Sequence, residues 1–275
     1  MEATNCRRVY GVDFSGAKDA GKKIWIASGV IENTLRIEEC HRADALPGSG
    51  KSRDQCLVAL RDFIAKEDAC AFGLDFPFGL PQALVKQKER WEDFVLSFPG
   101  DYSSPEEFRR LCREASGGRE LKRITDQKSK TPFSPYNLRL YRQTYYGIRD
   151  VLHPLVRDQL ACVLPMQHAL PDRPWIMEIC PASTLKLRWK DTCSPYKGRT
   201  DEHRAARASI LERLEATGAL SIPAQAVRLK ILEDRGGDSL DSVIAALATS
   251  RALRDPALLA VQISNAYALE GYVYV

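Results

Sequence analysis

Five carboxylates lie where apolar segments of this sequence end or where a helical pattern begins, and these residues have the clearest capacity for chemistry. Asp13 ends an apolar run in YGVDFSG, Asp75 ends another in AFGLDFPFGLP, and Glu178 lies within WIMEICP. Asp238 and Asp241 open the pattern GGDSLDSVIAALAT. A buried carboxylate is costly without a compensating charge, and a bound cation is one such compensation. Mg²⁺ and Mn²⁺ prefer carboxylate oxygens and water, so they are the expected ions.

The segments that must position these carboxylates alternate between strand and helix patterns. In the first 80 residues we expect three strands in an antiparallel meander, a crossover helix and a fourth strand, at 8–14, 22–31, 34–41, 52–66 and 70–76. The fourth strand should pair parallel to the first. Asp13 and Asp75 would then emerge at one edge of the sheet, where open α/β sheets usually have their sites.

The rest of the chain predicts a helical insertion and a helical C-terminal third. Prolines interrupt residues 82–173, where we expect helices and no clean strand. A strand, three helices and a short terminal strand should follow, at 175–180, 199–217, 223–232, 238–254 and 270–275. Asp238 and Asp241 are three residues apart and therefore share one helix face, which can point back at the sheet edge.

Four motifs in this order resemble the predicted RNase H-like nucleases called domain of unknown function 429, in the RuvC-type arrangement. They are GVDFSGA, GLDFPFGLP, EICPAST and GGDSLDSVIAALAT, and they span residues 11–249. The resemblance implies an α/β fold: an RNase H-like mixed sheet flanked by helices, as a single domain of residues 1–275 with the insertion at 82–173. It also implies that Asp13 bridges metal ions, that Asp75 is the second strand ligand, and that Asp241 or Asp238 is the helix ligand. Glu178 fits the family pattern, but its place on a strand departs from the RNase H arrangement.

The predicted activity is cleavage of nucleic-acid phosphodiester bonds by a two-metal mechanism. Two Mg²⁺ or Mn²⁺ ions about 3.5 to 4 Å apart can activate a water and stabilise the departing oxygen. Asp13, Asp75, Asp238 and Asp241 are the expected ligands, and Glu178 is a further catalytic candidate. The sequence leaves open whether the substrate is DNA or RNA and whether the protein acts as a homodimer.

A basic segment inside the predicted insertion is a candidate contact for nucleic acid. Residues 105–145 hold ten basic and five acidic side chains, and a cluster of this kind can bind phosphates. The aromatic residues there, which include Tyr141 and Tyr145, can stack on bases or form the core of the insertion. Candidate substrate contacts are Ser15 and Lys18 beside Asp13 and, from the resemblance of RITDQKSKTPFSP, Arg123, Asp126 and Lys130.

Other interpretations of the same residues remain open. Asp13 can be a turn former, and Asp75 and Asp238 can be helix caps, in a nucleic-acid-binding module without activity. ALPGSGKS at 45–52 approaches the phosphate-binding loop of nucleotide phosphotransferases, although Ala45 replaces its first glycine. GVDFSGA and GLDFPFG also resemble the phosphate loops of actin-like kinases, which have two RNase H-like halves where this sequence predicts one.

Composition limits the class of protein. The 275 residues carry a formal charge of +4, 44% are hydrophobic, and no run approaches the ~20 apolar residues of a membrane span. The eight cysteines lie far apart, which does not favour a zinc site or a disulfide scaffold. We therefore expect a cytoplasmic globular protein without a membrane partner.

Overall fold

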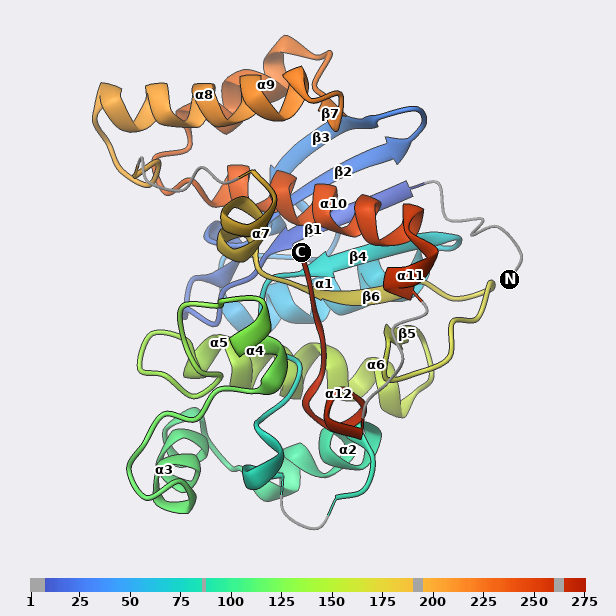
Figure 1. Cartoon of the computed structure of the whole chain (residues 1–275), viewed down its shortest axis with the longest axis vertical. Coiled ribbons are helices and arrows are strands. Elements are labelled where there is room, and N and C mark those ends of the chain that lie inside the picture. Colours follow the sequence, from blue (N-terminus) through green and yellow to red (C-terminus); the bar gives the residue numbers. More distant parts are fainter. Residues whose placement is uncertain (1–7, 86–87, 190–194, 260–264) are drawn as a thin grey trace.

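The computed structural model describes residues 8–85, 88–189, 195–259 and 265–275, and its central element is a mixed β-sheet (Figure 1). In the described part of the chain the sheet has eight strands in the order β5-β6-β4-β1-β2-β3-β7, with β8 paired to β6. The α/β class predicted from the sequence is confirmed. No helix among the described residues is both long enough and apolar enough to cross a membrane.

The first half of the sheet matches the predicted order of elements. Strands β1 (Arg8–Asp13), β2 (Trp25–Ile31) and β3 (Leu35–Arg42) form an antiparallel meander. Helix α1 (Arg53–Lys66) crosses one face, and β4 (Cys70–Leu74) returns parallel to β1. The carboxyl ends of β1 and β4 therefore lie side by side, as predicted.

The second half of the sheet extends from β4. Strand β6 (Trp175–Ile179) pairs parallel to β4, and the predicted terminal strand is β8 (Val273–Tyr274), parallel to β6. Strand β5 (Cys162–Leu164) corrects the expectation that residues 82–173 hold no strand: it is only three residues long, too short to show a period, and pairs parallel to β6. At the far edge, β7 (Leu220–Ser221) pairs parallel to β3.

Most of the predicted insertion is a helical lobe that extends from one side of the sheet (Figure 1). It consists of α2 (Trp91–Asp101), α3 (Pro105–Ala115), α4 (Ile124–Lys128), α5 (Tyr141–Tyr146), the π-helical turn η4 (Gly147–Leu152) and α6 (His153–Arg157). Three short 3₁₀ helices follow strands β1, β3 and β4 among the described residues: η1 (Ala20–Lys22), η2 (Ala43–Ala45) and η3 (Gln82–Leu84). The lobe and α1 share one hydrophobic core on their face of the sheet.

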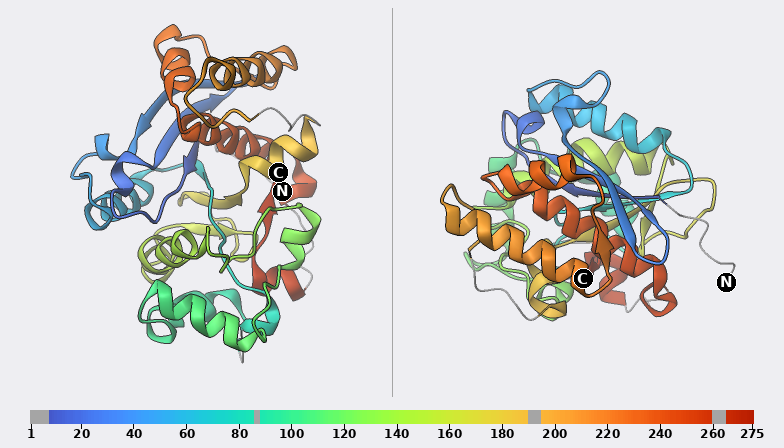
Figure 2. Two further views of the ribbon diagram at one scale, coloured as in Figure 1. Left: turned by 90° about the vertical axis from the view of Figure 1, so that its left-hand side faces the viewer. Right: turned by 90° about the horizontal axis from the view of Figure 1, so that it is seen from above.

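Helices from the C-terminal third cover the opposite face (Figures 1 and 2). They are α7 (Pro181–Arg188), α8 (Asp201–Ala216), α9 (Gln225–Glu233), α10 (Asp238–Arg254) and α11 (Pro256–Leu259). Helix α12 (Asn265–Glu270) instead packs against α2, α4 and η3 of the lobe (Figure 1). Helix α10 lies directly on β1: a Cβ added at Gly11 would lie 2.0 Å from the Ser242 carbonyl oxygen. Gly11, two residues before Asp13, therefore serves the packing of α10 on β1.

Candidate metal centre

Two aspartates stand at the carboxyl ends of neighbouring parallel strands. Asp13 is the last residue of β1, and Asp75 directly follows β4, where its N–H donates to the Val12 carbonyl oxygen at 3.0 Å. The side chain of Asp13 is 8% exposed, and Asp75 is partly buried. The β1–β4 pairing therefore fixes where both carboxylates leave the sheet.

The first turn of α10 brings two more aspartates to this edge. Gly237 precedes the helix with a φ of +76°, a left-handed conformation that suits glycine, and Asp238 is the first helical residue. Asp238 is thus not the N-cap. One turn later, Asp241 points inward and is only 4% exposed. The amino-terminal end of a helix carries partial positive charge and stabilises carboxylates, so this position favours both.

Three of the four carboxylates lie close enough to share one ion. One oxygen each from Asp13, Asp238 and Asp241 lies within 4.8 Å of the other two. Opposite ligands of an octahedral Mg²⁺ are about 4.2 Å apart, since each bond is about 2.1 Å long. Asp75 lies outside this group of three, but its charge acts on Asp13. We call these four residues the acid cluster.

The surroundings of the acid cluster do not supply enough positive charge to keep all of its carboxyl groups ionised. Burial raises the pKa of Asp13 well above its ordinary value, and the charges of Asp241 and Asp238 raise it further. Burial and then the charge of Asp241 raise the pKa of Asp75 to about 8, and burial raises the pKa of Asp238. The Lys197 ammonium opposes all three shifts without cancelling them. The cluster can therefore accept further positive charge.

Two residues that the sequence analysis missed lie against the acid cluster. The Lys197 Nζ lies 2.5 Å from Asp241 Oδ2 and 3.5 Å from Asp238 Oδ1. The Tyr196 hydroxyl donates to Asp241 Oδ1 at 2.6 Å. Burial, followed by the charge of Asp241, raises the pKa of Tyr196, so its hydroxyl stays protonated. A Tyr–Lys–Gly loop has neither strand nor helix periodicity, so the sequence gives little signal for these two residues.

A buried arginine holds the loop that carries Tyr196 and Lys197. Arg207 on α8 is 2% exposed, and its guanidinium donates to the main-chain oxygens of Tyr196 at 2.6 Å, Gly198 at 3.3 Å and Leu232 at 2.9 Å. The Gly198 N–H in turn donates to the Arg235 carbonyl oxygen at 2.9 Å. These bonds on both sides of Lys197 fix its backbone beside the start of α10.

Glu178 belongs to a different set of contacts from the acid cluster. Its carboxylate accepts from the Arg123 guanidinium at 2.5 and 2.8 Å and from the Phe78 N–H at 3.0 Å. Arg123 also binds both carboxylate oxygens of Asp126, at 2.8 and 2.9 Å. Each of the three charged residues is at most 3% exposed. We call Arg123, Asp126 and Glu178 the arginine cluster; it ties α4 to β6.

The arginine cluster does not face solvent, which bears on two predicted substrate contacts. Arg123 and Asp126 bind each other and Glu178 in the interior, whereas Lys130 of the same motif is exposed. Burial raises the pKa of Glu178, and the Arg123 guanidinium opposes that rise. The structure therefore gives Arg123, Asp126 and Glu178 a structural explanation that the motif alone did not show.

The remaining predicted contacts lie near β1. Ser15 is partly buried, and its hydroxyl accepts from the Ala17 N–H at 3.3 Å. Lys18 is exposed, and its carbonyl oxygen accepts from the N–H of Arg53 at 2.9 Å. Lys51 of the phosphate-loop-like segment is also exposed, but the strand before that segment, β3, pairs antiparallel with β2.

Helix α5 places the basic part of the lobe next to the acid cluster. A Cβ at Gly16 would lie 2.5 Å from the Arg142 carbonyl oxygen, and the Gln143 amide donates to the Asp75 carbonyl oxygen at 2.5 Å. Arg142 itself is exposed. The neighbouring tyrosines are core residues, however: Tyr136, Tyr141, Tyr145 and Tyr146 are each at most 8% exposed. Of the two interpretations of these aromatics, the structure supports packing over base stacking.

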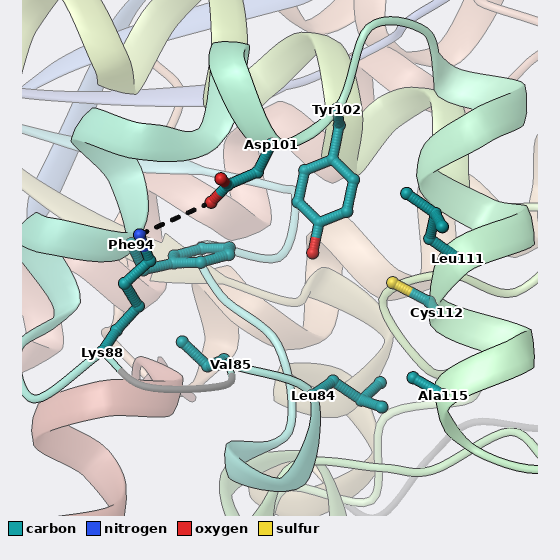
Figure 3. Close-up of a pocket in the computed structure, with 9 residues that line it drawn as sticks. All are labelled: Leu84, Val85, Lys88, Phe94, Asp101, Tyr102, Leu111, Cys112 and Ala115. Atoms are coloured by element: carbon teal, nitrogen blue, oxygen red, sulfur yellow. Dashed lines mark ion pairs between the residues drawn. The ribbon is translucent and has the colours of Figure 1, made fainter.

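A separate pocket of about 380 Å³ lies within the helical lobe (Figure 3). Apolar side chains of η3, α2 and α3 line most of it, and one ion pair, Lys88 with Asp101 at 3.7 Å, lies at its wall. None of the acid cluster residues lines this pocket.

The candidate site therefore rests on geometry and charge. Four aspartates from two strand ends and one helix converge, and Lys197 is the one cation in the described residues that forms ion pairs with them. The resemblance to the RNase H-like family remains a prediction from the motifs. Comparison of the chain with protein-family models, curated proteins and solved structures gives no significant match.

Proposed function

We propose that this protein is a metal-dependent nuclease that hydrolyses nucleic-acid phosphodiester bonds on an RNase H-like core. The observation that carries the proposal is the acid cluster: four aspartates converge on one sheet edge, and three of them can place an oxygen within 4.8 Å of the other two. A set of carboxylates with a single lysine partner is typical of a site that binds a divalent cation.

The donor set fits Mg²⁺ or Mn²⁺. All candidate ligands are hard carboxylate oxygens, and no histidine or cysteine is part of the three-residue group. A bound ion of this kind polarises a phosphoryl oxygen and lowers the pKa of a water molecule. Asp13 and Asp241, the two most buried members, would hold and orient the ion, with Asp238 completing the set.

Asp75 has a different expected role. Its pKa of about 8 means that the metal-free protein holds a proton on this carboxyl group at neutral pH. A bound divalent cation would lower this pKa, because its charge offsets the like-charge repulsion within the cluster. We therefore propose Asp75 as an additional ligand that loses its proton when the ion binds.

The substrate class follows from the neighbouring basic surface. Helix α5 packs on the loops after β1 and β4, and Arg142 and Arg139 from this region are exposed. Lys18 is exposed on the β1 side. Cations on two sides of a metal centre can hold the phosphates of a polynucleotide on either side of the bond that is cut.

The arrangement of elements supports the RNase H-like part of the proposal. A strand that ends in Asp13, an antiparallel meander, a crossover helix, a parallel strand followed by Asp75 and a late helix with two aspartates occur in the order that the motifs of this family predict. The insertion between β4 and β6 would be the lobe that contacts nucleic acid.

A titration of thermal stability with Mn²⁺ or Mg²⁺ tests the metal centre without a choice of substrate. Because an ion that binds only the folded state stabilises it, we expect a saturable rise in melting temperature for wild type. Asp13→Asn should lose this rise, whereas the control Asp68→Asn, an exposed residue before β4, should keep it. The absence of any rise in wild type would refute the metal centre and leave the binding module as the better proposal.

Cleavage assays then test the activity. Single-stranded, double-stranded and hybrid DNA and RNA would be incubated with wild type and Asp13→Asn in the presence of Mn²⁺. We expect cleavage of at least one substrate by wild type and none by the variant. Equal cleavage by both proteins would assign the activity to a contaminant or to another site.

A further inference from the structure

We propose that Lys197 is a built-in cation of the acid cluster, so that its ammonium group takes the place of a second divalent ion and the cluster binds one ion instead of two. The inference rests on the proposed function, because it assigns a residue and a stoichiometry to the same site. It replaces the two-ion arrangement that the sequence suggested.

The contacts of Lys197 are those that a metal ion would make. Its Nζ bridges the two helix-borne carboxylates, at 2.5 Å from Asp241 and 3.5 Å from Asp238. Both carboxylates belong to the group whose oxygens lie within 4.8 Å of one another. An ammonium group that bridges two ligands of a candidate ion site occupies part of the space that a second ion would need.

Each oxygen of Asp241 already accepts one donor of the chain and keeps a further lone pair with which it can bind an ion. One oxygen accepts from Lys197 and the other from the Tyr196 hydroxyl at 2.6 Å. By contrast, neither Asp13 nor Asp75 forms an ion pair with any residue that the structure describes. The position left for a divalent ion is therefore on the strand side of the cluster, between Asp13 and the helix.

The fold holds Lys197 in this place, which separates it from a chance surface ion pair. Arg207 binds the main-chain oxygens of Tyr196 and Gly198, the residues on either side of Lys197. The side chain of Lys197 is half-exposed, while the side chain of its partner Asp241 is buried. Exposed pairs contribute little, but a cation fixed against a buried carboxylate is weakly screened and acts strongly on any second cation.

A second divalent ion would have to displace this ammonium or lie against it. At separations of a few ångströms inside a protein the repulsion between such charges is large. Removal of the lysine charge should therefore open the second position. The matched replacement is methionine, which keeps an unbranched stem of similar length and removes the charge.

Counting bound Mn²⁺ tests the inference. Equilibrium binding would be measured by calorimetry and by the electron paramagnetic resonance of free Mn²⁺ for wild type, Lys197→Met, Lys197→Arg and the control Lys66→Met, an exposed lysine at the opposite sheet edge. We expect one Mn²⁺ in wild type, Lys197→Arg and Lys66→Met. Lys197→Met should bind two, the first at least about tenfold more tightly than wild type because a nearby positive charge is gone.

The melting temperature without metal gives a second measurement. In EDTA, Lys197→Met should melt below wild type and Lys197→Arg, because the aspartates lose their counter-charge; if the variant does not fold without metal, the count is made on protein purified with Mn²⁺. Two Mn²⁺ in wild type, or one in both wild type and Lys197→Met, would overturn the inference and leave the nuclease proposal intact. Failure of all four proteins to bind Mn²⁺ would refute the metal centre itself, and this inference with it.

Discussion

Two groups of buried carboxylates lie on neighbouring strands and have opposite surroundings. Leu74, next to Asp75, is in register with Glu178 across the β4–β6 pair, so the acid cluster and the arginine cluster are neighbours. Glu178 meets a guanidinium with a forked, two-bond contact, and Asp126 meets the same guanidinium. Asp13 and Asp75 have no such partner among the described residues.

The difference shows what decides the role of a buried carboxylate. Both groups contain a carboxylate at or near the end of an apolar strand: Asp13 and Asp75 in one group, and Glu178 in the other. What separates them is whether a distant segment supplies an arginine. Arginine forms planar, bidentate contacts that neutralise a carboxylate and satisfy its hydrogen bonds, so that the carboxylate stabilises the fold. Carboxylates that are buried together with one lysine remain short of positive charge, and the proposed metal-dependent activity rests on them.

The largest expected effect tests the arginine cluster. Arg123→Met would leave Glu178 and Asp126 buried without a counter-charge, and we expect a loss of about 3 to 5 kcal/mol in the free energy of unfolding. Urea denaturation measures it. The control Arg157→Met breaks an exposed pair with Asp158 and should cost at most about 1 kcal/mol. Equal losses in the two variants would remove the distinction between buried and exposed pairs here.

Asp13→Asn tests the acid cluster, where we expect a loss of activity without the loss of stability expected for Arg123→Met. Cleavage should fall at least about 100-fold, the scale of losing a key electrostatic group in an active site. The metal-free melting temperature should stay the same or rise, because the substitution relieves repulsion among like charges. Steady-state cleavage and calorimetry in EDTA give the two values. A marked fall in metal-free stability would instead make Asp13 a structural residue.

Glu178→Gln tests whether Glu178 belongs to the arginine cluster alone or also binds the metal ion. Because Gln keeps the shape and loses the charge that Arg123 needs, we expect a loss of about 1 to 3 kcal/mol in stability. The rise in melting temperature with Mn²⁺ should persist, since Glu178 lies outside the acid cluster. Loss of that rise, with stability unchanged, would return Glu178 to the metal ligands.

The last expected effect is a pH dependence of the metal-free protein. The pKa of Asp75 is raised to about 8, so between about pH 4 and pH 8 the folded state holds a proton that the unfolded state has released. Stability from this group is present at low pH and is lost as the pH rises through 8. Melting curves in EDTA should show this fall, and Asp75→Asn should reduce it. A flat profile in wild type would contradict the raised pKa.

The sequence predicted the strands and helices that have a clear hydrophobic periodicity, and the edge of the sheet at which Asp13 and Asp75 lie. The meander, α1, β4 and α10 lie within a few residues of their predicted bounds, and the parallel pairing of β1 with β4 was predicted from the crossover helix before β4. The aspartates of the candidate site could therefore be named. Arg207, Tyr196 and Lys197 could not, because their roles depend on tertiary contacts between α8, its preceding loop and α10.

Glu178 shows the same limit from the other side. Its sequence context, a carboxylate inside an apolar strand, is what a metal ligand would have. The arginine that binds it lies 55 positions away, directly before the five-residue helix α4, and nothing in spacing or composition pairs the two residues. Sequence patterns find buried carboxylates, whereas only the fold shows which of them are already neutralised.

The close packing of α10 on the sheet has a consequence for which ions the acid cluster can accept. A Cβ at Gly11 would overlap the backbone of α10, and a Cβ at Gly73 would lie 2.1 Å from the Thr249 hydroxyl, so the helix lies as close to the two strands as their backbones allow. The gap between Asp241 on the helix and Asp13 on β1 is therefore set by backbone contacts. Ca²⁺, with bonds of about 2.3 to 2.6 Å and up to eight ligands, needs a wider and more yielding cage than Mg²⁺ or Mn²⁺. The close packing at these two glycines therefore sets which ionic radius the site accepts. Replacing either glycine by alanine should change the relative affinities for Mg²⁺, Mn²⁺ and Ca²⁺ while the same aspartates remain the ligands.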